Sequence, residues 1–328
     1  MAALSAFSRF LFRWPQCGVL AAVLLGGCAS LPTDVARPVS SALAPAEATT
    51  TALGKLVAAR RPAGVGAAMS GYALVDSPNM AYASRLALAG QAERTLDIQY
   101  YAIQADPSVA RLLRQVRAAA ARGVRVRILL DDFNSTGKNA LVMGMAFVPN
   151  VEMRMFNPLA GARGSAALRT LGALGEFERI QHRMHNKLFL ADNAWGMAGG
   201  RNLGDAYFGT ADGSNFVDMD VLAAGPVVAK MSASFDQYWN NPLAYPVQSL
   251  ISREELRTLR ESLAATSATP ATGATPGDAQ AVPAPAAASA PAPADPLDLA
   301  GVPLVWAPGA LVVDQPAPLV PEQSAANT

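Results

Sequence analysis

The segment from Met184 to Asn202, MHNKLFLADNAWGMAGGRN, constrains the fold of this chain more than any other stretch. If the segment is extended, successive side chains point to opposite faces of a strand. His185 and Lys187 then share one face, and Leu188 and Leu190 share the other. The alternation predicts a strand with one apolar face and two polar side chains projecting together at its beginning.

A turn and a glycine pair follow this strand. The Asp192–Asn193 pair favours turn geometry, and residues 194–198 are typical of a returning strand. The Gly199–Gly200 pair interrupts that strand and allows Arg201 and Asn202 to approach the first strand again. The segment therefore predicts a hairpin at which an imidazole, a fixed cation and an amide converge, and such groups can attack a phosphodiester.

Each of these residues also has a purely structural interpretation. His185 can be an ordinary strand histidine, Lys187 a charge that protects a sheet edge, and Asp192 a turn former. The chain contains only two histidines, so a chance His-x-Lys-x4-Asp pattern has a probability on the order of 1%. The joint pattern favours a functional interpretation of the group.

The sequence resembles the signature of the phospholipase D superfamily at six positions: His185, Lys187, Asp192, Gly199, Gly200 and Asn202. The stretches RMHNKLFLADN and GGRNLGDAYFG are similar to the cardiolipin synthase C-type branch of that superfamily. The resemblance extends from Tyr72 to Trp239 and more weakly to Leu263. It implies an α/β fold, with a mixed β-sheet flanked by helices on both faces in a single phospholipase D-like repeat.

The resemblance also implies a reaction without metal or cofactor. His185 is the implied nucleophile, which forms a phosphohistidine, and Lys187 and Asn202 are the implied phosphate-binding residues. Asp218 matches the position of a carboxylate that pairs with the nucleophilic histidine, although Asp218 can instead belong to a solvated strand face. The implied substrates are phospholipids, because C-type relatives make cardiolipin from phosphatidylglycerol with phosphatidylethanolamine as phosphatidyl donor.

Three further residues of the motif complete the predicted site. Gly199, Gly200 and Arg201 are predicted to contact substrate together with Asn202. Asp192 is grouped with the catalytic residues by the motif, and its expected contribution is structural.

Family members of this type use a second motif histidine as general acid, and this sequence has a single motif. The other histidine, His182, falls on the opposite strand face and is predicted to be structural or solvated. The sequence therefore suggests a homodimer that shares motifs or a half-enzyme with little activity. A lipid-binding lipoprotein without turnover and a homodimeric nuclease are alternatives. Nucleic acid is not an expected partner, because the net charge is only +1.

The first 27 residues resemble a bacterial lipoprotein signal peptide. Arg9 and Arg13 precede a short apolar run over residues 18–27, which is too short to span a bilayer. The run ends in Leu-Gly-Gly-Cys, and Cys28 offers a thiol for lipid attachment. Ala29 suggests sorting to the outer membrane, with the protein facing the periplasm. An ordinary signal peptide with an incidental cysteine is the alternative.

The remaining chain divides by composition into three parts. Residues 28–66 are predicted to be a flexible tether, 67–264 the phospholipase D-like domain, and 265–328 a low-complexity Ala/Pro-rich tail. Residues 305–314 of the tail resemble the beginning of a second half in two-repeat relatives.

Hydrophobic patterning predicts the elements of the domain. Apolar periodicity predicts helices over 81–94, 107–122, 226–240 and 252–263, and strands over 96–100, 124–130, 151–155 and 216–222. The succession of strand, helix and strand between 96 and 130 predicts a right-handed parallel unit. Three polar residues after it favour a helix-capping loop over a metal site: Asp131, Asp132 and Asn134.

Overall fold

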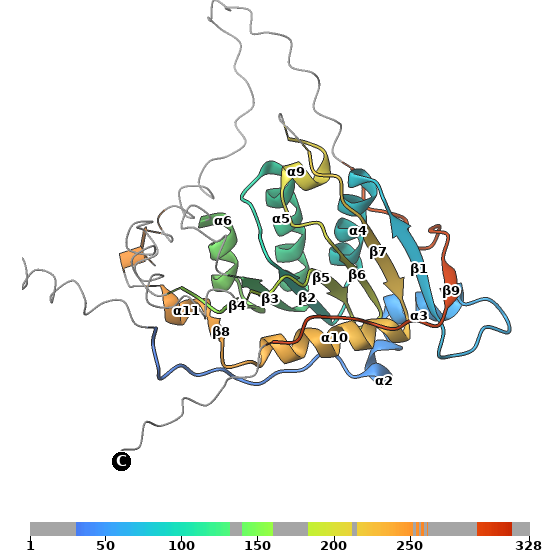
Figure 1. Cartoon of the computed structure of the whole chain (residues 1–328), viewed down its shortest axis with the longest axis horizontal. Helices are drawn as coiled ribbons and strands as arrows, with labels where there is room; N and C mark the ends of the chain where they lie inside the picture. The colour runs from blue at the N-terminus through green and yellow to red at the C-terminus, as the bar shows by residue number, and fades with distance from the viewer. Residues whose placement is uncertain are drawn as a thin grey trace, which may run out of the picture.

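The computed structural model describes residues 31–131, 140–159, 183–211, 215–251 and 294–316, with a few positions between 254 and 261. These residues form one nine-stranded sheet in the order β8-β4-β3-β2-β5-β6-β7-β1-β9 (Figure 1). The strands are β1 (Ser70–Val75), β2 (Thr95–Tyr100), β3 (Arg125–Asp131), β4 (Val151–Phe156), β5 (Leu188–Ala191), β6 (Trp195–Gly199), β7 (Asp220–Ala224), β8 (Ala244–Pro246) and β9 (Val305–Ala307).

The sheet is mixed, as the sequence predicted. β3 pairs in parallel with β2 and β4, and the other neighbouring strands pair antiparallel. The helices are α2 (Pro45–Ala48), α3 (Ala52–Arg60), α4 (Pro78–Gln91), α5 (Pro107–Ala121), α6 (Ala140–Met143), η2 (Gly144–Phe147), α9 (Asp205–Phe208), α10 (Pro226–Trp239) and α11 (Val247–Leu250). None of the helices within the described ranges is long and apolar enough to cross a bilayer.

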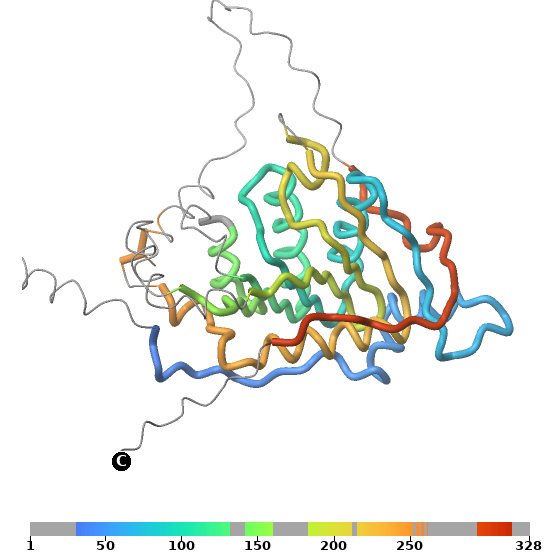
Figure 2. The backbone as a smooth tube through the Cα atoms, in the orientation of Figure 1, coloured from blue at the N-terminus to red at the C-terminus, as the bar shows by residue number. Residues whose placement is uncertain are grey.

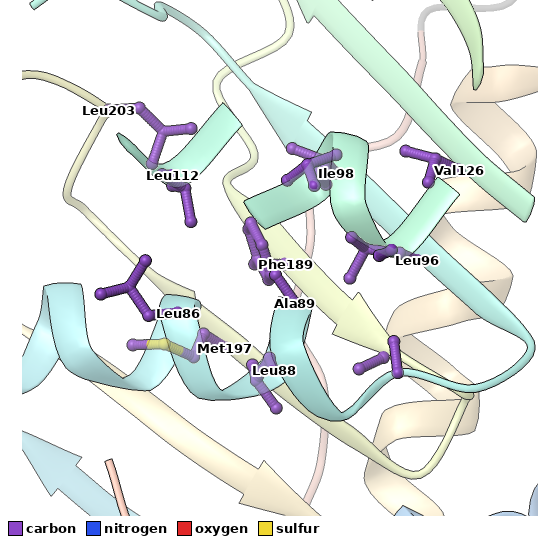
Figure 3. Packing of buried hydrophobic residues seen from close by; sticks show 14 of the residues in the cluster. Leu86, Leu88, Ala89, Leu96, Ile98, Leu112, Val126, Phe189, Met197 and Leu203 are labelled. Atoms are coloured by element: carbon purple, nitrogen blue, oxygen red, sulfur yellow. The ribbon is translucent and has the colours of Figure 1, made fainter. Parts of the chain in front are cut away.

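Helices cover both faces of the sheet. α4 and α5 lie on one face, where Leu86 and Leu112 pack with Ile98 and Phe189 of the strands (Figure 3). α10 lies on the other face (Figure 1). There Phe235 belongs to a second apolar cluster with Leu188 and Leu190 of β5. Burial of these two apolar layers is the main force that holds the sheet between its helices.

Of the two helices on the first face, α5 has the predicted bounds to within one residue, whereas α4 begins and ends three residues before the predicted range of 81–94. α4 begins after Ser77, whose side chain accepts a hydrogen bond from the backbone N–H of Met80 at 3.1 Å. α5 begins at Pro107 and gives way to Gly123, which has a positive φ of 95° that glycine adopts without strain. The predicted parallel unit β2-α5-β3 is therefore confirmed.

The hairpin β5–β6 is confirmed, although β5 begins later than the sequence predicted. Asp192 and Asn193 both have positive φ angles, 53° and 51°, which suits a two-residue turn between twisted strands. β5 starts at Leu188, so His185 and Lys187 lie just before the strand. The predicted strand over 216–222 is displaced along the chain, because β7 begins four residues later, at Asp220, and ends two residues later, at Ala224.

The prediction of a flexible tether up to residue 66 is wrong for residues 38–60. Leu53 of α3 is fully buried in the main core. The extended stretch before the helices is bound through its backbone: Arg127 donates to the carbonyl of Ser40 at 3.0 Å, and Asp236 accepts from the N–H of Ala42 at 2.9 Å. Contacts to backbone atoms leave no periodic signal in the side chains, so composition alone suggested a linker.

Part of the predicted low-complexity tail also belongs to the domain. Leu299 and Val302 are buried in the core, and β9 pairs with β1 at the sheet edge. After β9 the chain runs along α10, close to the N-terminal segment (Figure 2). There Tyr238 of α10 donates a hydrogen bond to the carbonyl of Asp314 at 3.1 Å. The domain boundaries of 67 and 264 are therefore too narrow on both sides.

Candidate active site

Four adjacent strands bring the candidate residues to one edge of the sheet. β2 ends at this edge, β5 begins there, β6 ends there and β7 begins there, as the pairs Gln99–Leu188 and Gly199–Asp220 show. The residues just outside these strand ends therefore lie close together although they are far apart in sequence. They are the segments 101–103, 185–187, 200–203 and 218–219.

His185 is exposed at this edge and stacks on Tyr101. The two ring centroids are 4.7 Å apart and the ring planes are inclined by 30°. Lys187 donates a hydrogen bond from Nζ to the carbonyl of His185 at 2.8 Å, and its Nζ lies 5.8 Å from the centroid of the Tyr101 ring. Tyr101 was not predicted as a site residue, because it follows β2 without any motif.

The charge of Lys187 depends on two neighbouring carboxylates. Partial burial lowers the pKa of Lys187, because the ammonium ion loses hydration. Asp218 and Asp220 act in the opposite direction and raise it. The two aspartates therefore help to keep Lys187 in the cationic form that can bind a phosphate.

The two aspartates at the beginning of β7 differ in environment. Asp220 is buried and accepts from Nη2 of Arg85 at 3.0 Å, and Nη1 of Arg201 lies 3.6 Å from it. Asp218 is half-buried and accepts a hydrogen bond from the N–H of Met219 at 2.7 Å. Among the described ion pairs none joins Asp218 to His185, so the orienting role of Asp218 stays a prediction.

The glycine pair makes room for these aspartates. A Cβ atom on Gly199 would lie 2.0 Å from Oδ1 of Asp220 and 2.6 Å from its Cα. A Cβ atom on Gly200 would lie 2.2 Å from Oδ1 of Asp218. The backbone of β7 therefore requires glycine at position 199, whereas a side chain at position 200 would displace only the carboxylate of Asp218. The predicted contact of both glycines with substrate is an additional proposal.

The side chain of Arg201, which was predicted to contact substrate, is instead buried and stabilises the fold. Its guanidinium donates to the carbonyls of Val75 at 3.0 Å and Asp76 at 2.9 Å. Together with the pair to Asp220, these bonds join the end of β1 to the beginning of β7. A guanidinium buried in this way stabilises the sheet edge beneath the site.

Asn202 lies at the edge, where the sequence placed it. Its Oδ1 accepts from the N–H of Ala102 at 3.2 Å, and its Nδ2 donates to the hydroxyl of Tyr207 at 3.1 Å. An amide group has two N–H donors, so the second one can point to a phosphate oxygen. The contact with Ala102 places Asn202 next to the residue that stacks on His185.

Asp192 lies at the other end of β5 from Lys187. Its buried carboxylate accepts hydrogen bonds from the backbone N–H groups of Glu93, Arg94 and Thr95 at 2.8 to 3.2 Å. These bonds fix the hairpin turn to the start of β2. The geometry supports the structural contribution expected for Asp192 and places it apart from the reacting groups.

Asp131 is a further residue that shapes the site. It ends β3 and is buried, and its carboxylate accepts from the N–H of Met184 at 2.9 Å and from Arg183 at 3.2 Å. These contacts fix the chain just before His185. Asp132, Asn134, His182 and Cys28 lie outside the described residues. Within the described part of the chain, no three His, Cys, Asp or Glu side chains gather as a metal site would require.

Comparison with known proteins indicates the family of this domain. Residues 86–239 match the family described as cardiolipin synthase, PLD-like domain. This domain belongs to the phospholipase D superfamily. Within that superfamily it is similar to the cardiolipin synthase branch, because 171 residues are 44% identical to cardiolipin synthase C of Escherichia coli (strain K12).

Two further proteins from Helicobacter pylori are similar to this chain. An uncharacterized protein of Helicobacter pylori is 37% identical over 180 residues, which are 55% of this chain. The structure of NucT from Helicobacter pylori aligns with a TM-score of 0.40 at 15% identity and covers 54% of this chain and 99% of that one. The matches cover only 35% of the E. coli enzyme and 36% of the H. pylori relative, so this chain corresponds to about a third of their length.

Proposed function

We propose that the domain cleaves or transfers a phospholipid phosphodiester through a phosphohistidine intermediate on His185. The observation that carries this proposal is the meeting of His185, Lys187, Asn202 and Asp218 at the end of four adjacent strands. Similarity to cardiolipin synthases supports a phospholipid as substrate and phosphatidyl transfer as the reaction.

The reaction has two steps in this proposal. A ring nitrogen of His185 attacks phosphorus, a P–N bond forms, and the bond from phosphorus to the leaving alcohol breaks. Water or a lipid hydroxyl then attacks phosphorus and loses its proton to the group that protonated the leaving alcohol, and the P–N bond to His185 breaks. Lys187 and the amide of Asn202 stabilise the negative charge that develops on the phosphoryl oxygens. Asp218 is proposed to stabilise the positive charge on His185.

A general acid has to protonate the leaving alcohol in the first step. The sequence has one His-x-Lys motif, and a second copy of the chain can supply His185 of its own site across a two-fold axis. Without that second histidine we expect turnover to be about 10²–10⁴-fold lower. Light scattering gives the oligomeric state of the full chain, and turnover is measured on the same sample. A dimer with full turnover would support the shared site, and a monomer with low turnover would support the half-enzyme.

The test uses the full chain with phosphatidylglycerol and phosphatidylethanolamine in mixed micelles. We expect cardiolipin or phosphatidic acid to form, and we expect an acid-labile phosphoryl adduct on His185 after rapid quenching. His185→Ala should abolish both, and His182→Ala is the matched control that should keep both. Turnover by His185→Ala at the wild-type rate would contradict the proposal. Cleavage of DNA without cleavage of phospholipid would favour the nuclease alternative.

We also propose that Cys28 carries lipid and anchors the protein in the outer membrane, facing the periplasm. The support is the Leu-Gly-Gly-Cys sequence after a basic and apolar leader. Several acyl chains, each contributing about 0.8 kcal/mol per buried CH₂, would make attachment permanent. Cys28→Ala should block processing and sorting, whereas Cys17→Ala should not. Normal processing and sorting of Cys28→Ala would contradict the anchor.

A further inference from the structure

Exposed apolar side chains lie directly beside the candidate site. Phe216, Val217 and Met219, here called the apolar rim, have relative exposures of 55%, 102% and 50%. Asp218 lies between them in sequence and is half-buried towards Lys187. The same short segment therefore presents apolar side chains to the outside and a carboxylate to the site.

The apolar rim is fixed to the site by three contacts. The ring of Phe216 stacks on Tyr207 with centroids 4.7 Å apart, and the hydroxyl of Tyr207 accepts from Asn202. The N–H of Phe216 donates to the carbonyl of Ala206 at 2.8 Å. The carbonyl of Met219 accepts from the N–H of Gly200 at 3.2 Å. These contacts fix the segment that carries the exposed side chains to residues 200–207 at the edge of the site.

We propose that the apolar rim inserts into a phospholipid surface and holds the site at the level of the head groups. A bilayer phosphodiester lies directly above acyl chains, so a surface that binds it needs polar groups and apolar side chains side by side. Apolar side chains of interfacial segments reach about 5–10 Å below the head groups. Val217 is fully exposed and directly precedes Asp218, whose charge acts on Lys187, so apolar and polar groups lie side by side here. The inference rests on the proposed phospholipid substrate.

A lipid surface suits the apolar rim better than a second copy of the chain. Stable association of two proteins needs roughly 800 Å² per partner with a shaped apolar centre, and three protruding side chains provide far less. Val217 is completely exposed, which suits insertion between lipids. Asp218 lies inside the segment, so we expect attachment to depend on apolar burial and to be insensitive to salt.

The test places an environment-sensitive dye at residue 217 of the full chain. The variant Val217→Cys is made with Cys17→Ser and Cys28→Ser, and Val39→Cys on the same background is the control, because Val39 is also exposed, at 79%, on the N-terminal segment. With vesicles of phosphatidylglycerol and phosphatidylethanolamine, the dye at 217 should shift to shorter wavelength and be quenched by nitroxides on the acyl chains. The dye at 39 should not be quenched.

Three results would overturn the proposal: no quenching at 217, equal quenching at 217 and 39, or a spectral shift at 217 that grows with protein concentration in the absence of vesicles. The last result would assign the apolar rim to contact between copies. Quenching of the dye reports insertion and requires no turnover. A chain that is inactive but whose dye is quenched would therefore contradict the proposed reaction and leave the proposal for the apolar rim intact. A chain active on vesicles whose dye stays in water would contradict the apolar rim alone.

A second variant links the apolar rim to turnover. Val217→Asp should lower turnover on vesicles roughly 10- to 100-fold, because an aspartate is costly among lipids. Turnover on a dispersed short-chain phospholipid should stay at the wild-type value, because Val217 does not touch the reacting groups. Equal turnover of Val217→Asp and wild type on vesicles would contradict the proposal.

Discussion

Tyr101 and His185 lie with their rings face to face, with centroids 4.7 Å apart and planes inclined by 30°. The phenol ring follows β2 and the imidazole precedes β5, so the pairing of these two strands determines the contact. A contact of this kind restricts the rotation of an exposed imidazole and favours the orientation in which it can attack phosphorus.

Removing the Tyr101 ring should lower turnover. Stacked aromatic pairs contribute about 0.5–1.5 kcal/mol, so we expect Tyr101→Ala to reduce kcat roughly 2- to 10-fold. Tyr101→Phe keeps the ring and should restore the wild-type rate. Steady-state kinetics with phospholipid in micelles measures kcat for both variants. An equal loss of kcat in Tyr101→Ala and Tyr101→Phe would show that ring stacking does not cause the loss.

The pH profile should depend on Lys187 and Asp218. Burial lowers the pKa of Lys187 and Asp218 raises it, and the phosphate-binding form is the cation. Turnover should therefore fall as pH rises through the pKa of Lys187, and Asp218→Asn should move this falling limb to lower pH. Glu152→Gln, an exposed change on β4, is the control and should leave the limb in place. A limb that moves to higher pH in Asp218→Asn would contradict the assignment.

Asp192 should contribute to the stability of the fold and should not take part in the reaction. Asp192→Ala leaves the buried N–H of Thr95 and the partly buried N–H groups of Glu93 and Arg94 without their acceptor, so we expect a loss of about 1–3 kcal/mol in the free energy of unfolding. Asp192→Asn keeps an acceptor oxygen and tolerates the positive φ of the turn, so its loss should be smaller. Urea unfolding measures both. Loss of turnover in Asp192→Asn at unchanged stability would indicate a catalytic role.

Gly199 should be intolerant of any side chain. The Cβ atom of Gly199→Ala would lie 2.6 Å from Cα of Asp220, and this backbone contact can be relieved only by moving β7. We expect a loss of about 1–3 kcal/mol in stability, as for overpacked interiors. Gly66→Ala is the matched control, because nothing lies within 4 Å of the added atom. Thermal unfolding of the two variants should differ, and equal unfolding temperatures would refute the close approach.

The N-terminal segment should contribute to the core. Leu53 is fully buried, so Leu53→Ala should lower the free energy of unfolding by about 2–5 kcal/mol. Lys55→Ala, an exposed change in the same helix, should stay within about 0.5 kcal/mol of wild type. A Leu53→Ala variant as stable as wild type in urea would restore the interpretation of this region as a tether.

The local elements could be predicted from the sequence because their causes are local. The apolar stripe of α5 lies between Pro107 and Gly123, and this pattern predicted its length. The Asp192–Asn193 pair predicted the hairpin, because both residues tolerate positive φ. The family motif then predicted the edge at which His185, Lys187 and Asn202 lie.

The tertiary structure alone decided which side chains remain available to a substrate. Arg201 and Asp220 have the same charges as Lys187 and Asp218, but their burial against Arg85 and the end of β1 makes them part of the scaffold. Tyr101 acquires its contact with His185 only when β2 pairs with β5. Such contacts join residues that are many positions apart, so they depend on strand order and packing, which no local pattern of residues records.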